Sequence, residues 1–136
     1  MELSKALQIS AAGMKAQGTR LRVIAENMAN ADSLPETPND LPYRRKVVLF
    51  RNEMDRALGV ERVTVSKIDV DGGEFDREYM PGHPAADGEG YVLKPNVSTL
   101  IEMTDMREAQ RSYEANIGVV ELSRTMLMRT IDLLRN

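Results

Sequence analysis

The sequence predicts an α+β fold in which two long terminal helices pair as an α-helical coiled coil and a small β-rich domain lies between them. About thirty residues at the N-terminus and about forty at the C-terminus repeat apolar residues in steps of three and four, which is typical of paired helices. The residues between them alternate β-branched and polar side chains between turn signals, as strands do. Prolines mark both borders, with Pro35 and Pro38 after the first helix and Pro95 before the second.

Composition narrows the class of protein. The 136 residues suffice for one modest domain, and the net charge of −3 argues against a nucleic-acid partner. The absence of cysteine excludes a disulfide framework, thiolate catalysis and cysteine-based zinc sites. No apolar run approaches the roughly 20 residues of a membrane-spanning helix. Glu2 follows Met1 and no apolar block succeeds it, so we expect no cleaved secretory signal peptide.

A helix is expected within residues 1–33. Its apolar row follows a heptad pattern that includes polar Ser10 and Gln17. Asn30 is a suitable C-terminal cap, and Asn27 could fix the register between helices or equally face solvent. The residues predicted to pack against another helix or subunit are Leu3, Leu7, Met14, Leu21, Ile24 and Met28.

Short strands are expected within the middle domain, residues 34–95. Residues 46–50 form a β-branched and aromatic run. Further along, Val63 and Val65 alternate in one phase and Ile68 and Val70 in the other. This change of phase predicts a β-bulge near Ser66 and Lys67.

The second half of this domain contains turn signals. Asp71-Gly72-Gly73 predicts a hairpin turn that leads into a returning strand over residues 75–79. A last short strand is expected at residues 91–93, and a short helix at residues 52–58. With about sixty residues, the domain lies near the lower limit of independent stability.

A second long helix is expected within residues 96–136. Asn96, Ser98 or Thr99 could cap its start, and Thr99 with Glu102 fits a capping box. Asn116 could fix register between helices or equally face solvent. The residues predicted to pack against another helix or subunit are Met103, Met106, Tyr113, Ile117, Val120, Leu127, Ile131 and Leu134.

Both helices carry a second apolar row beside the first. In the C-terminal helix this row is Ala115, Val119, Leu122, Met126 and Leu133. We expect the two helices to run antiparallel, because both lead into the same middle domain, and such a pair buries only one row of each. An ordinary two-helix hairpin packed on the sheet explains the pattern equally well, whereas uncovered apolar rows would mark an interaction surface.

The sequence contains few candidates for catalytic or metal-binding residues. His83 is the single histidine and stands in a proline-rich loop, where a solvated side chain is favoured over a metal ligand. Asp69, Asp71 and Glu74 lack the spacing of a calcium loop and fit turn formers better. The basic run Tyr43-Arg44-Arg45-Lys46 favours salt bridges or a strand edge. We therefore expect no catalytic, cofactor-binding or metal-binding residues, although a small hydrolase or metal protein centred on His83 is an alternative.

Four stretches resemble the rod and hook axial proteins of the bacterial flagellum. They are LQISAAGMKAQGTRLRVIAENMANA, LPYRRKVVLF, PGHPAADGEGYVLKPNV and EMTDMREAQRSYEANIGVVELSRTMLMRTIDLLR. In order and spacing they are similar to the proximal-rod proteins of the basal body. The sequence departs from the usual family pattern over residues 32–41 and about 50–61.

The resemblance implies a structural protein and not an enzyme. Such proteins assemble into a helical rod that crosses the periplasm, encloses the export channel, transmits motor torque and is required for swimming. The terminal helices would form the inner coiled-coil domain and residues 34–95 the outer β domain. Implied partners are further copies, other proximal and distal rod subunits, the adaptor to the export gate and the MS ring, with no nucleic acid, small-molecule substrate or cofactor. Export would use the flagellar type III apparatus. The alternative is a coiled-coil adaptor or secretion-apparatus component that builds no rod.

Overall fold

The structure is a computed structural model that describes residues 2–135, and it contains two long helices and two β-hairpins. Both hairpins are antiparallel. This arrangement confirms the predicted α+β class. The elements are α1 (Glu2–Ala29), β1 (Lys46–Asp55), β2 (Val60–Val70), β3 (Asp76–Tyr79), β4 (Tyr91–Lys94) and α2 (Thr99–Arg135).

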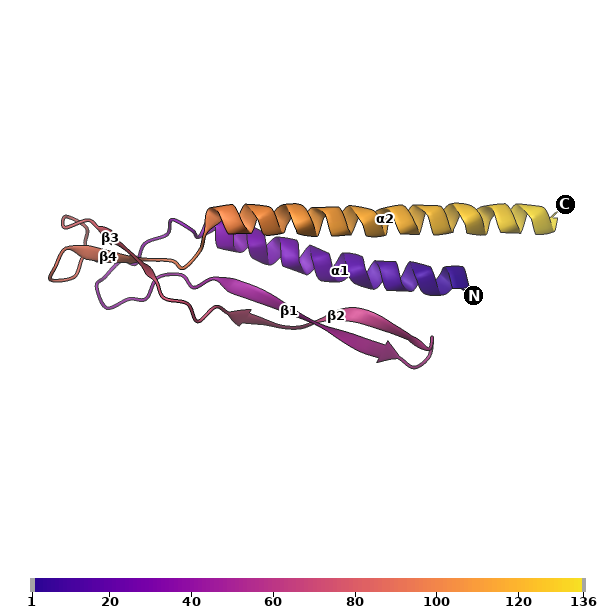
Figure 1. Ribbon diagram of the computed structural model, residues 1–136, viewed down its shortest axis with the longest axis horizontal. Coiled ribbons are helices and arrows are strands. Elements are labelled where there is room, and N and C mark those ends of the chain that lie inside the picture. Colours follow the sequence, from indigo (N-terminus) through magenta and orange to yellow (C-terminus); the bar gives the residue numbers. More distant parts are fainter. Residues whose placement is uncertain (1, 136) are drawn as a thin grey trace.

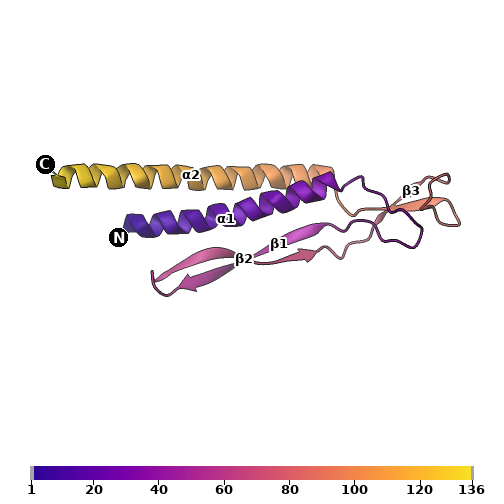
Figure 2. The ribbon, with the colours of Figure 1, turned by 180° about the vertical axis from the view of Figure 1, so that it is seen from behind.

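The elements form an elongated molecule with α1 in the middle (Figures 1 and 2). One side of α1 packs on α2 and another on the β1–β2 hairpin, whereas α2 contacts no element but α1 within the described chain. The helices run antiparallel, as expected, and α2 continues past the N-terminal end of α1 (Figure 1). Neither helix is both long and apolar enough to cross a membrane, over the residues that the structure describes.

The β1–β2 hairpin contains the predicted bulge. Leu49 pairs with Lys67 but the next residue, Phe50, pairs with Val65, so Ser66 is the extra residue. At the tip, the amide of Gly59 donates to the carbonyl of Asp55 over 2.8 Å, and Gly59 has a φ of 67°. A residue without Cβ suits this left-handed conformation.

Two expectations for the middle domain are wrong. Asp71-Gly72-Gly73 does not form a hairpin turn, because β2 pairs only with β1 and β3 pairs only with β4. The Asp-Gly-Gly segment instead connects two separate hairpins. The stretch 52–58 is not helical either, since β1 continues to Asp55 and its residues pair with the start of β2. A salt bridge of 2.8 Å between Arg62 and Asp55 joins the strands there.

Apolar burial is concentrated on α1 and not in the middle domain. Ala16, Val23 and Ile24 of α1 are buried, as is Ala109 of α2. The middle region contributes only small buried side chains, the largest being Val92. The position of the long hairpin therefore depends on its contact with α1 and on polar contacts at the end where the two helices meet.

Candidate functional site

The buried amide of Asn27 joins three segments of the chain at the end where α1 stops and α2 begins. Its Nδ2 donates to the carbonyl of Lys46 over 2.8 Å and to Oε2 of Glu102 over 3.1 Å. Its Oδ1 accepts from the Tyr43 hydroxyl over 2.8 Å and from the Lys46 amide over 2.9 Å. Because a primary amide has two donors and two acceptor sites, the side chain is fully satisfied while only 1% exposed.

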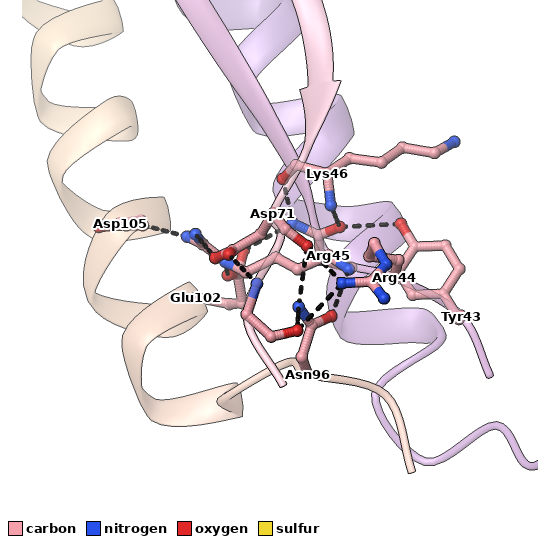
Figure 3. A network of polar contacts seen from close by, with 10 residues as sticks. Tyr43, Arg44, Arg45, Lys46, Asp71, Asn96, Glu102 and Asp105 are labelled. Carbon is pink, nitrogen blue, oxygen red and sulfur yellow. Dashed lines mark hydrogen bonds and ion pairs between the residues drawn. The ribbon is translucent and has the colours of Figure 1, made fainter. Parts of the chain in front are cut away.

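Arg45 is the second centre of this site. We call the site the polar joint and define it as Asn27 together with Tyr43, Arg45, Lys46, Asp71, Asn96, Glu102 and Asp105, of which all but Asn27 are labelled in Figure 3. Its guanidinium donates to the fully buried carboxylate of Glu102, and it pairs with Asp105 over 3.3 Å and with Asp71 over 3.5 Å. Burial favours the neutral form of Arg45, but the hydrogen bond and charge of Glu102, helped by the aspartates, outweigh it and raise the pKa of Arg45. A charge pair this well partnered can be tolerated in the interior.

The link between the two hairpins is held at the same place. Nη1 of Arg44 donates to the carbonyls of Asp71 and Gly73, each over 3.0 Å. Asn96 donates to the same carbonyls and accepts from the amide of Arg45 over 2.8 Å (Figure 3). The segment after β2 is thereby tied both to the segment before β1 and to the segment before α2.

The surroundings of the joint shift the pKa values of two ionisable groups, Glu26 and Tyr43. The hydrogen bond from Lys46 lowers the pKa of Glu26, with further help from Arg22. Burial raises the pKa of the Tyr43 phenol, whose hydroxyl donates to Asn27. The Glu26 carboxylate and the Tyr43 hydroxyl have their hydrogen-bond partners within this group of residues. Neither forms a pair of a nucleophile with a base. Within residues 2–135, no three His, Asp or Glu side chains are placed to hold a metal ion. The hydrogen bonds and ion pairs of the joint therefore hold three segments of the chain at fixed angles to one another.

Small residues bring the two helices close together. Ser10, Gly13 and Ala16 are buried on α1, and Ala109 and Ser123 on α2. A Cβ built on Gly13 would lie 2.9 Å from Nδ2 of Asn116, so only glycine fits there with the present side-chain position. Asn116 donates to the carbonyl of Ser112 over 2.9 Å and lies half-buried at this contact with Gly13.

The predicted packing residues of α1 flank this line of small residues. Ile24 is buried and the remaining five are half-buried, namely Leu3, Leu7, Met14, Leu21 and Met28. At the end of the helix, Asn30 caps with its side chain, since its Nδ2 donates to the carbonyl of Glu26 over 2.8 Å. Ser98 directly precedes α2 and its carbonyl accepts from the amide of Glu102, whereas a cap by its hydroxyl stays a prediction.

The predicted packing residues of α2 divide into two groups. Beside α1, the half-buried members are Met106, Tyr113, Ile117 and Val120. The exposed members are Met103 near the start and Leu127, Ile131 and Leu134 near the end. We call residues 124–135 the overhang, because every one of them is exposed and α2 runs past α1 there (Figure 1). The second row is uncovered too, with Val119, Leu122, Met126 and Leu133 between 42% and 78% exposed.

Comparison with known proteins places these features in a family. Residues 89–133 match the family model described as flagellar basal body rod FlgEFG protein C-terminal. The chain is 54% identical to the flagellar basal-body rod protein FlgC of Agrobacterium fabrum over 98% of this chain and 96% of that one. It is 37% identical to FlgC of Salmonella typhimurium, with 98% of both chains covered, and 34% identical to FlgC of Bacillus subtilis, with 93% and 95% covered. The chain belongs to the FlgC family of flagellar basal-body rod proteins.

Membership of the FlgC family gives the chain a structural role in the flagellar basal-body rod and supports the resemblance seen in the four sequence stretches. The matched C-terminal model covers β4 and all of α2 up to Leu133, which includes the exposed second apolar row and the overhang as far as Leu133.

The sequence did not indicate the centre of the joint. Glu102 was expected to complete a capping box with Thr99, but its carboxylate reaches Asn27 and Arg45 instead, so this expectation is wrong. The salt-bridging role favoured for the basic run is confirmed for Arg45 and Lys46. His83 accepts the amide proton of Ala85 through its Nδ1 over 3.0 Å, which stabilises a turn in this FlgC-family loop. The signal that could have found the joint is an acidic residue on the apolar side of a helix opposite an Arg-Arg pair.

Proposed function

We propose that the chain is a subunit of a helical rod that crosses the periplasm, transmits motor torque and encloses the export channel. The helices, within residues 1–33 and 96–136, would form the inner coiled-coil domain of that rod, and residues 34–95 its outer domain. The proposal includes no enzymatic activity, cofactor or nucleic-acid partner. It rests on the family relation together with the apolar surface of α2.

The observation that carries the proposal is the overhang. Six large apolar side chains lie on these twelve or so residues and are 42–83% exposed: Met126, Leu127, Met128, Ile131, Leu133 and Leu134. A helix that is apolar on most sides is normally buried among several neighbours. Every residue of this segment is exposed in the described chain, so other subunits would supply those neighbours.

Torque transmission requires a subunit that does not bend at its joints. Side chains packed at close range resist bending better than exposed ion pairs, which contribute about 1 kcal/mol or less each. The close approach of Gly13 to Asn116 and the saturated hydrogen bonds of Asn27 supply such contacts. The helix pair and the long hairpin would therefore move as one body.

The partners in this proposal are further copies of the chain, other proximal and distal rod subunits, the adaptor to the export gate and the MS ring. The chain would travel unfolded through the flagellar type III apparatus without removal of a signal peptide. No observation favours the alternative of a coiled-coil adaptor that builds no rod.

Leu127→Asp tests the proposal. The side chain is 42% exposed, so the isolated variant should keep the free energy of unfolding of the parent within about 0.5 kcal/mol. In the rod the same carboxylate would be buried without a partner, which costs several kcal/mol. We expect normal export, loss of the subunit from isolated basal bodies and loss of swimming.

Thr125→Asp is the matched control, because it introduces the same charge at an exposed position two residues away on another side of the helix. It should retain incorporation and swimming. Normal rods in the Leu127→Asp strain would show that the overhang is not an assembly surface.

A further inference from the structure

A groove lies between α1 and β2, separate from the joint. Its volume is about 580 Å³ and most of its surface is apolar. The α1 side chains recur at helical spacing and include three alanines, and the β2 side includes two valines. The lining residues are Gln8, Ala11, Ala12, Lys15, Ala16 and Thr19 of α1, and Arg62, Val63, Thr64 and Val65 of β2.

The overhang continues an interface that already exists within the chain. Along α2, Met106, Tyr113 and Val120 are seven residues apart and lie half-buried beside α1. The same period continues to Leu127 and Leu134, which are 42% and 83% exposed. The row that packs on α1 in the first part of α2 therefore runs on into the overhang, where its members are exposed.

We infer that the overhang of one copy docks in the α1–β2 groove of a second copy, an inference that rests on the proposed function. In both parts of α2 the same row would then meet an α1 helix, first its own and then that of the second copy. The alanines of the groove allow a helix to approach closely, and the leucines and methionines of the overhang supply the large side chains that fill it.

The geometry of the contact favours open assembly. The groove and the overhang are different surfaces of the molecule, so each contact leaves one free groove and one free overhang on the resulting pair. Such a heterologous contact adds copies along a helix or around a ring, whereas overhang-to-overhang pairing would close a two-fold dimer. A self-assembling rod subunit needs the first kind of contact.

Cysteine cross-linking tests the inference directly, because the chain has no cysteine of its own. Two copies that differ in length by a tag are produced together in cells lacking the native protein. One carries Ala12→Cys in the groove and the other Leu127→Cys on the overhang. Basal bodies are isolated and treated with a short bis-maleimide, and a product that contains one long and one short copy is measured.

We expect that product to be on the order of tenfold more abundant than in a control with Ala25→Cys, which is exposed on α1 outside the groove, because neighbouring thiols react at a high effective concentration. Lys15→Cys with Ile131→Cys is a second pair on the same surfaces. Rods that contain both copies but link neither pair above the control would overturn the docking inference and leave the proposed function intact. Dominant linkage between two Leu127→Cys copies would overturn it as well. Absence of the unmodified chain from basal bodies would overturn both.

Discussion

The two ends of α2 differ in what covers them. At its start, Glu102 is fully buried and each of its carboxylate oxygens has a donor, from Arg45 or from Asn27. At its end, Leu134 is 83% exposed and every residue of the overhang is exposed. The start of α2 thus combines a satisfied buried carboxylate with exposed Leu100, Ile101 and Met103, whereas the overhang has exposed side chains only.

The contacts at the start of α2 are specified within one chain, whereas the exposed apolar side chains of the overhang would be covered by neighbours in an assembly. Buried hydrogen bonds have strict geometry, so a joint built from them sets the angle between helices and hairpin before any partner arrives. Apolar contacts depend less on direction, and a methionine-rich surface adapts to several neighbours. A rod subunit benefits from a fixed joint and from an adaptable surface at the far end of α2.

Hydrogen exchange of the isolated chain should show the largest contrast between the two ends. A helical segment of about twelve residues that are all exposed is marginally stable, so amides of residues 127–135 should exchange at nearly unprotected rates. Amides of residues 106–120, which lie beside α1, should be protected on the order of a thousandfold more. Mass spectrometry of peptides from the two segments measures this, and equal protection in a proven monomer would contradict the comparison.

Glu102→Ala should have the largest effect on the joint. It leaves the guanidinium of Arg45 with its weaker partners Asp71 and Asp105, and it removes one acceptor from Asn27. Breaking a buried ion pair in this way should lower the free energy of unfolding by about 3 kcal/mol. Urea denaturation followed by circular dichroism is the measurement.

Glu108→Ala is the control, since this carboxylate is 70% exposed and pairs with Arg20 over 3.7 Å at the surface. It should change the free energy of unfolding by less than about 0.5 kcal/mol. A similar loss in the two variants would mean that the joint contributes no more than an ordinary surface pair.

Several parts of the fold could be predicted because a short-range pattern determines them. The steps of three and four predicted both helices, and the change of phase between Val65 and Ile68 located the bulge at Ser66. The pairing of the strands could not be predicted in the same way. Asp71-Gly72-Gly73 has the composition of a hairpin turn, but its carbonyls are held by Arg44 and Asn96, which are distant in sequence.

The candidate site was predictable only in part, for a related reason. Large apolar residues mark the side of a helix that faces a partner, but they do not reveal which residue lies at the closest contact. Gly13 and Ser10 are buried there, while Leu7 and Met14 flank them and are half-buried. Glu102 was missed because a charged residue is rarely buried, and its partner Arg45 is 57 residues away in sequence.

Two glycines of α1 offer the finest test of how the helices pair between the two ends of α2. Gly18 has nothing within 4 Å of the position that a Cβ would take, so Gly18→Ala should raise the free energy of unfolding by about 0.5–1 kcal/mol through helix propensity alone. Gly13→Ala makes the same chemical change, but its Cβ would lie 2.9 Å from Nδ2 of Asn116.

The methyl group at position 13 would displace Asn116 from its hydrogen bond to Ser112, which should offset the gain in propensity by about 1 kcal/mol or more. Gly13→Ala should therefore leave the free energy of unfolding unchanged or lower it. In an Asn116→Ala background the obstacle is gone, and Gly13→Ala should then stabilise the chain about as much as Gly18→Ala does. A double-mutant cycle by urea denaturation measures this coupling, and a value near zero would show that Gly13 and Asn116 are not in close contact.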